Sequence, residues 1–128
     1  MNIPADLRYT EYDEWARVEG EEVVTGITDF AQDQLSDIVY VELPEVGDRF
    51  DQSETYGVVE SVKAASDVHM PVSGEVVTAN TELEDAPEIV NQDPYGQGWF
   101  VRIKPASPAQ LDALMNANAY RARVEAQD

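Results

Sequence analysis

The sequence predicts a mainly β fold with one short helix after the first strands and a helical segment at the C-terminus. Apolar runs of strand length, rich in Val and Ile, recur through most of the chain and are bounded by Gly, Pro, Asn or Asp. The connections between these runs are short, which favours antiparallel neighbours. The 128 residues, of which 43% are apolar, suffice for one hydrophobic core. We therefore predict a single domain over residues 1–128, with its core at about 20–105.

Six segments carry the clearest strand pattern, and they cover residues 22–27, 37–43, 56–62, 68–72, 75–79 and 99–104. Turn-forming residues separate several of them. After the first strand, Thr28 is an N-cap candidate, and the apolar spacing of residues 30–35 predicts a short helix. The acidic segment 81–91 contains Pro87 and is predicted to be an irregular loop.

The C-terminal part of the chain, at about 107–125, is predicted to be helical. Ser107 at the N-cap, Pro108 at the first helical position and Gln110 at the third form the pattern of a capping box. A second helical stretch at about 117–124 should follow and pack on the sheet through Tyr120.

The charge balance excludes some classes of partner. Twenty-six acidic residues against eight basic ones give a formal net charge of -18, which would repel nucleic acid and anionic membranes. An acidic surface can simply keep a chain soluble. Because only two lysines remain, we favour a halophilic host with a very salty cytoplasm, where screening removes the self-repulsion.

The sequence also constrains the cellular location of the protein and the kinds of metal site that it can form. The chain has no stretch of about 18 apolar residues and no signal peptide at its start, so we expect a soluble, cytoplasmic protein. Without cysteine, neither a disulfide framework nor a thiolate metal site is available. The single histidine, His69, cannot form a zinc site alone and is expected to be a packing residue on a strand.

A lysine in a turn is the most informative feature. Lys63 lies between two apolar arms and is followed by the small residues Ala64, Ala65 and Ser66. Taken alone, this pattern favours an ordinary surface lysine. This chain is poor in lysine, however, and an acidic residue would be expected at a turn exposed to solvent. The presence of Lys63 there therefore indicates that its amine has a role. An exposed amine can attack an activated acyl group and form an amide.

The segment around this lysine, ESVKA at 60–64 followed by SD at 66–67 and MPVSGEV at 70–76, closely resembles the lipoylation hairpin of glycine cleavage H-proteins. Further matches to that family are TGITDFAQD at 25–33, DIVYVELPEVG at 37–47 and VNQDPYG at 90–96. The resemblance covers nearly the whole chain in one register.

The resemblance implies a barrel-sandwich hybrid fold and lipoate attached through an amide to Lys63. It does not fit biotin carriers, whose lysine typically lies between two methionines, because Val62 and Ala64 flank the lysine here. Lipoyl domains of 2-oxoacid dehydrogenases usually have Asp before the lysine and belong to longer chains, so this chain fits them poorly as well.

The function implied is that of a carrier and not of an enzyme, and no nucleophile-base constellation, phosphate loop or metal cluster contradicts this. In the family, a pyridoxal-phosphate glycine decarboxylase loads an aminomethyl group onto the lipoyl arm. A tetrahydrofolate-dependent aminomethyltransferase then takes up the one-carbon unit, and dihydrolipoamide dehydrogenase reoxidises the arm. A lipoate attachment enzyme is a further partner, and the free protein is expected to be a monomer.

Several site residues follow from the same resemblance. Glu14 and Asp67 match the acids that contact the aminomethyl ammonium when the arm folds into a surface cleft, although simple solvation of Glu14 is an equal alternative. The family often has His before the Glu-Trp pair, where this chain has Asp13. Recognition by the modifying enzyme is expected to involve the residues around the lysine, namely Glu60, Ser61, Val62 and Ala64.

Two other functions stay open from the sequence. One is an H-like lipoate-binding protein that works in sulfur oxidation or as a lipoyl relay, with the same hairpin and different partners. The other is an interaction module that has kept the fold without lipoylation, which predicts an intact mass without lipoate.

Overall fold

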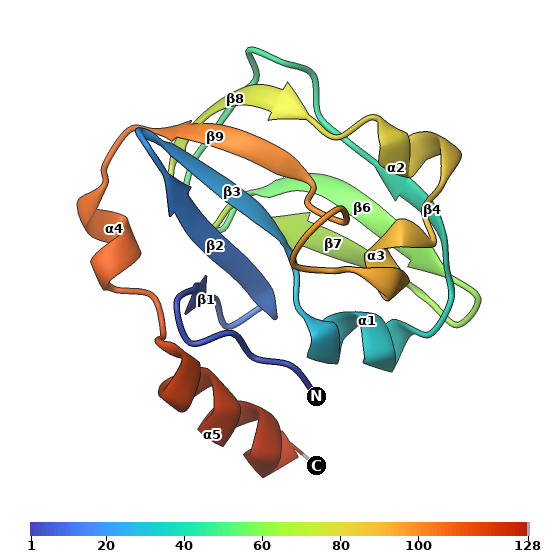
Figure 1. Cartoon of the computed structure of the whole chain (residues 1–128). Coiled ribbons are helices and arrows are strands. Elements are labelled where there is room, and N and C mark those ends of the chain that lie inside the picture. The colour runs from blue at the N-terminus through green and yellow to red at the C-terminus, as the bar shows by residue number, and fades with distance from the viewer. Residues whose placement is uncertain (128) are drawn as a thin grey trace.

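The computed structural model describes residues 1–127 and contains two antiparallel sheets that face each other (Figure 1). The larger sheet has the order β1-β2-β3-β9-β8-β5, and the smaller has the order β4-β6-β7. The strands of the larger sheet are β1 (Arg8–Tyr9), β2 (Glu14–Glu19), β3 (Glu22–Ile27), β5 (Arg49–Phe50), β8 (Gly74–Ala79) and β9 (Val101–Pro105). Those of the smaller sheet are β4 (Ile38–Glu42), β6 (Thr55–Ser61) and β7 (Ala65–His69). The predicted mainly β fold is confirmed.

All six predicted strands are present, with shifts at their ends. β3 has the predicted bounds, whereas β7 covers residues 65–69 where we expected 68–72. The reason is that the hairpin ladder with β6 continues through the exposed polar residues Ser66 and Asp67, which the apolar pattern does not include. The strands β1, β2 and β5 were not predicted.

The short helix after the first predicted strand is confirmed as α1 (Asp29–Leu35). The hydroxyl of Thr28 caps it by accepting a hydrogen bond of 3.2 Å from the amide of Ala31. The predicted C-terminal helices are also present as α4 (Ala109–Asp112) and α5 (Ala117–Gln127). Tyr120 of α5 stacks on Tyr9 with 4.6 Å between the ring centroids, so this helix packs on the sheet as expected.

Two local predictions were wrong. The capping box does not form, because the carboxamide of Gln110 instead binds Ser73, accepting from its amide at 2.7 Å and donating to its hydroxyl at 3.2 Å. The segment 81–91 is not an irregular loop but contains the one-turn helices α2 (Glu82–Asp85) and α3 (Ile89–Gln92). Leu83 and Val90 anchor these helices in the core, and burial of their apolar surface stabilises helices that are only one turn long.

The buried side chains form two clusters on opposite faces of the larger sheet. The main cluster lies between the two sheets and includes Val23 and Ile103 from the larger sheet and Val59 and Val68 from the smaller. Side chains alternate along a strand, so Val24 points the other way, into a second cluster. That cluster joins the N-terminal segment to α5 and consists of Ile3, Leu7, Tyr9, Trp15, Val24, Phe30, Tyr120 and Val124. Strands β2 and β3 are thus held on both faces and give firm support to Glu14 at the start of β2.

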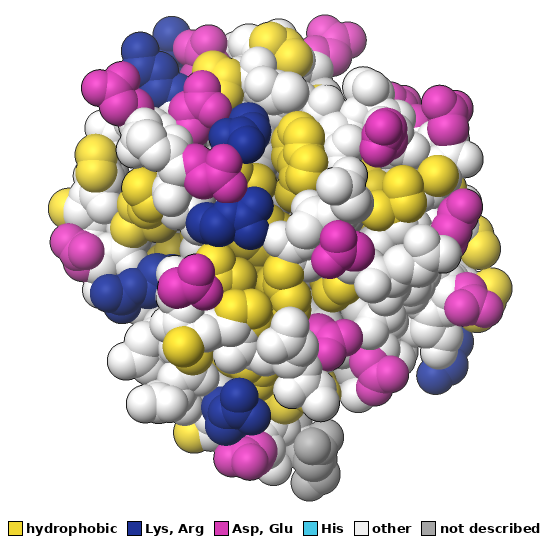
Figure 2. Space-filling view, viewed as in Figure 1, with side chains coloured by type: hydrophobic (Ala, Val, Ile, Leu, Met, Phe, Trp, Pro, Cys, Tyr) yellow, Lys and Arg dark blue, Asp and Glu magenta, His cyan; other side chains and the backbone are white. Residues whose placement is uncertain are grey.

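The acidic residues are spread over the surface. Figure 2 shows magenta side chains around the whole visible face, with apolar side chains between them near its centre. The five ion pairs among the described residues use only three arginines and His69, so most of the 26 acids have no cationic partner there.

Mutual repulsion among these acids should make stability depend on salt. We expect the free energy of unfolding to rise between about 0.05 and 2 M potassium chloride, because screening lengths fall from roughly 14 Å to a few Å over that range. Denaturant unfolding at each salt concentration measures this effect. An unfolding free energy that stays constant or falls would contradict both the expectation and the proposed halophilic host.

Candidate functional site

Lys63 lies in the tight turn between β6 and β7, as the sequence predicts. The turn is closed by a hydrogen bond of 2.8 Å from the amide of Ser61 to the carbonyl of Ala64. The hydroxyl of Ser61 also accepts from the amides of Lys63 and Ala64, each at 3.1 Å. Ser61 therefore fixes the backbone of the turn on both sides of the lysine.

The arms of this hairpin are anchored in the core while its tip is exposed. Val59 on β6 and Val68 on β7 are buried in the main cluster, whereas Lys63 is exposed and forms no ion pair within residues 1–127. A hydrogen bond of 3.0 Å from the amide of Val62 to the carbonyl of Asp37 ties the turn to the segment before β4. The result is a primary amine presented to solvent at a fixed position, which is the geometry a covalent carrier arm requires.

The residues beside the lysine form an exposed surface of mixed character. Val62 is 65% exposed at the tip, and Glu60 is exposed opposite Tyr40 in the β4–β6 ladder. Ala64 is also exposed and adds little bulk. An enzyme that approaches Lys63 would therefore meet one acid and two apolar side chains.

Glu14 is buried and not solvated, which removes the simpler of its two interpretations. Its side chain is 1% exposed, and every carboxylate contact is internal. Oε1 accepts a hydrogen bond of 2.9 Å from the hydroxyl of Thr10, and Oε2 accepts one of 2.6 Å from the amide of His69. Nδ1 of His69 lies 3.0 Å from the same Oε2. Burial raises the pKa of Glu14 to about 8, although the hydrogen bonds from His69 and Thr10 act in the opposite direction.

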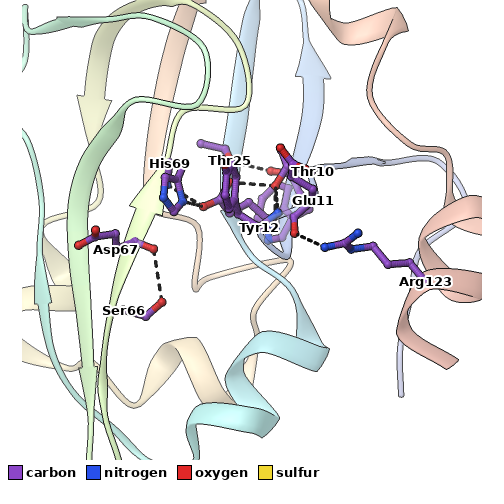
Figure 3. Close-up of polar contacts among 10 residues, drawn as sticks. Thr10, Glu11, Tyr12, Thr25, Ser66, Asp67, His69 and Arg123 are labelled. Carbon is purple, nitrogen blue, oxygen red and sulfur yellow. Dashed lines mark hydrogen bonds and ion pairs between the residues drawn. The ribbon is translucent and has the colours of Figure 1, made fainter. Parts of the chain in front are cut away.

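His69 is part of this site and was not predicted to be. It packs, as expected, with its ring stacked on Tyr12 at a centroid distance of 4.0 Å and an interplanar angle of 22°. It also binds Glu14 across the two sheets, a contact between residues 55 apart in the sequence. Figure 3 shows the ring of His69 beside the group that contains Thr10 and Tyr12. No local pattern in the sequence marks this contact, because Glu14 and His69 meet only through the packing of the two sheets.

Asp67 is exposed on β7 and has no side-chain hydrogen bond within residues 1–127. In Figure 3 its carboxylate points away from the group formed by Thr10, Tyr12 and His69. The structure therefore brings Glu14 together with His69, and it leaves Asp67 as a separate, exposed acid near the hairpin.

Asp13, which stands where the resemblance led us to expect His, is bonded to the C-terminal helix. Asp13 adopts a left-handed backbone conformation with φ of 65°, and its carboxylate accepts a hydrogen bond of 3.0 Å from the hydroxyl of Tyr120 on α5. It thus links the start of β2 to the C-terminal helix.

A surface hollow of about 430 Å³ borders this group. It is lined by Thr10 and Tyr12 on one side, by Met70 and Pro71 after β7 on another, and by the segment 113–115. Among residues 1–127, no three or more His, Cys, Asp or Glu side chains are arranged to hold a metal ion. No helix in that range is both long and apolar enough to cross a membrane.

Comparison with known proteins agrees with these features. The family model described as "Glycine cleavage H-protein" matches residues 7–127. The glycine cleavage system H protein of Anaeromyxobacter sp. (strain K) is 56% identical over 128 residues, which is 100% of both chains. That of Magnetococcus marinus is 58% identical over 125 residues, covering 98% of this chain and 89% of the relative.

A solved structure is similar as well. The crystal structure of a glycine cleavage system H protein from Mycobacterium marinum superposes with a TM-score of 0.87 at 38% identity, covering 94% of this chain and 98% of the other. The range matched by the family model includes the β6–β7 hairpin, the strand that carries Glu14 and the C-terminal helices. On these grounds the chain belongs to the glycine cleavage H-protein family.

Proposed function

We propose that this chain is the lipoyl-bearing shuttle of the glycine cleavage system. It carries the aminomethyl group from glycine decarboxylase to the tetrahydrofolate-dependent aminomethyltransferase and carries electrons to dihydrolipoamide dehydrogenase. It is a carrier component and not itself an enzyme. The observation that supports this proposal most directly is the exposed amine of Lys63 at the tip of a hairpin whose arms are buried.

The proposed cofactor is lipoate, joined by an amide to Nζ of Lys63. When bound, lipoate supplies the dithiolane on which both cargo and electrons travel. The chain supplies position: Ser61 fixes the turn, Val59 and Val68 hold the arms, and the four-carbon stem of the lysine gives reach. The small side chain of Ala64 leaves the amine accessible, so the residues present fit this group.

Recognition by the lipoate attachment enzyme is proposed to use Glu60, Ser61, Val62 and Ala64. We expect Val62→Asp to slow lipoylation by about tenfold, because a new charge at the tip must lose its hydration on docking. A time course of intact mass with purified attachment enzyme measures the rate.

Val46 offers a matched control, since it is also 65% exposed and lies in a different turn. Val46→Asp should be lipoylated at the unaltered rate. Equal rates for Val62→Asp and the unaltered protein would show that the tip side chain is not recognised.

The function is tested by intact mass and peptide mapping after expression in a host able to lipoylate. A lipoyl adduct on Lys63, followed by glycine-dependent loading with purified glycine decarboxylase, is the expected result. Protein without lipoate in such a host would favour an interaction module. Lipoylated protein that glycine decarboxylase does not load would favour an H-like protein of sulfur oxidation or a lipoyl relay.

A further inference from the structure

Large apolar side chains are exposed as a group at the end of the smaller sheet that carries the lysine turn. Seven such side chains are exposed within residues 1–127, and three of them belong to this end of the sheet, namely Val39 (54%), Tyr40 (47%) and Val62 (65%). The other four lie in separate segments of the chain. Single exposed apolar side chains are usual, whereas a group of them marks a surface that contacts another molecule.

A β-bulge exposes two of these side chains. The register of the β4–β6 ladder shifts between Ile38 and Tyr40, so Val39 is an extra residue in β4. In a regular strand with Ile38 in the core, the side chain of residue 40 would also point inward. The bulge instead leaves both Val39 and Tyr40 exposed and returns Val41 to the core. These two exposed side chains form the β4 patch.

The β4 patch is held beside Lys63 by contacts of the backbone. Tyr40 lies opposite Glu60 in the ladder, three residues before the lysine. The hydrogen bond of 3.0 Å from the amide of Val62 to the carbonyl of Asp37 joins the turn to the chain that enters β4 (Figure 1). A molecule that approaches the lysine from this side therefore meets the β4 patch as well as the turn.

We propose that the β4 patch, together with Val62, is the docking surface of the lipoate attachment enzyme. This inference rests on the proposed lipoylation of Lys63. Attachment takes place at Nζ, so the enzyme must approach to within the length of one lysine side chain from the turn. Enzymes that act on the dithiolane are separated from the turn by the length of the lipoyl chain and can work without touching β4.

The surroundings of the β4 patch define the chemistry of the face that docks on it. Asp37, Glu42 and Glu60 are exposed near the patch and form no ion pair within residues 1–127. The complementary face of the enzyme should therefore have an apolar centre and Lys or Arg at its rim. Contact between an enzyme and its protein substrate is transient, and a small interface suffices for it.

The first test measures the kinetics of lipoylation of the double variant Val39→Thr with Tyr40→Thr. Threonine keeps a β-branched side chain on the strand while it removes apolar surface. We expect the KM for the unlipoylated protein to rise about tenfold at unaltered kcat, because the patch contributes to binding and does not touch the reacting amine. Val18→Thr is the matched control, since Val18 is 59% exposed on the other sheet, and it should keep its KM. An unaltered KM in the double variant would overturn the inference.

A second variant tests the charge of the docking face. Asp37→Lys places a cation beside the β4 patch, and repulsion from a basic rim should raise the KM about tenfold. Glu21→Lys makes the same change of charge in the exposed turn between β2 and β3 and should leave the KM unaltered. Equal KM values for Asp37→Lys and the unaltered protein would contradict the proposed basic face.

A third measurement uses the unaltered sequence and needs no variant to fold. The unlipoylated, ¹⁵N-labelled protein is titrated with purified attachment enzyme in the absence of lipoate. The amide resonances of Val39, Tyr40 and Val62 should broaden or shift more than that of Val18. Resonances of Val39 and Tyr40 that stay unchanged while that of Val62 responds would overturn the inference.

These results separate the docking surface from the function on which it rests. If the attachment enzyme does not lipoylate the unaltered protein, the proposed function fails and the docking surface fails with it. If Lys63 is lipoylated and the double variant keeps its KM, only the docking surface fails. A double variant that is lipoylated normally but loaded slowly by glycine decarboxylase would assign the β4 patch to that enzyme and overturn the inference.

Discussion

Replacing Lys63 by Arg is expected to leave the fold intact and to reduce glycine-dependent electron transfer to background. The guanidinium keeps the positive charge and the exposure of the lysine, but it remains protonated at neutral pH and cannot form the amide. Because the side chain makes no ion pair within residues 1–127, thermal unfolding should shift by no more than about 1–2 °C. NADH formation in a system reconstituted with glycine decarboxylase, aminomethyltransferase and dihydrolipoamide dehydrogenase measures the activity.

The second lysine of the chain provides the control. Lys104 is exposed on β9, so Lys104→Arg makes the same chemical change away from the hairpin. It should retain the activity of the unaltered protein. Activity in Lys63→Arg, or a lipoyl adduct mapped to Lys104, would show that the wrong amine had been assigned.

Replacing Glu14 by Gln is expected to remove a large part of the pH dependence of stability. Burial raises the pKa of Glu14 to about 8 in the folded protein, from the ordinary carboxyl value of 4.5. A group whose pKa is raised on folding stabilises the folded state fully below the unfolded pKa, and that contribution is lost as the pH rises through the folded pKa. The unaltered protein should therefore lose on the order of 5 kcal/mol from this group between about pH 4.5 and pH 8.

The carboxamide introduced by Glu14→Gln cannot ionise, so the comparison isolates this one group. Denaturant unfolding of both proteins from pH 4.5 to 9 gives the difference in their unfolding free energies. The unfolding free energy of the unaltered protein should fall relative to that of Glu14→Gln between about pH 4.5 and pH 8. Above about pH 8 the difference between the two proteins should stay constant. A pH-independent difference would mean that Glu14 is ionised throughout, and that its three donors outweigh the cost of burial.

Local chemistry accounts for the parts of the fold that the sequence predicts well. The six predicted strands have apolar residues that repeat with strand spacing, and α1 begins at a Thr whose hydroxyl caps the helix. These signals depend on near neighbours in the chain. The turn at Lys63 belongs to the same class, because two apolar arms and small residues suffice to predict a hairpin tip.

Where prediction failed, a distant partner decided the structure. Strand β2 contains Glu14 in a buried position, which breaks the usual alternation and conceals the strand. The side chain of Gln110 bonds to Ser73, which is 37 residues away, instead of capping its own helix. The short helices α2 and α3 form because Leu83 and Val90 are buried in the core. The acidic residues around them do not show that these two side chains will be buried.

The same division applies to the site. The sequence by itself determined that a single amine stands at an exposed bend, because turn formation and the apolar arms are encoded within about 20 residues. Only the tertiary structure decided that the carboxylate of Glu14 is buried and hydrogen-bonded to His69 of the other sheet. Desolvation and hydrogen bonding depend on which strands meet, and no spacing along the chain reports on that.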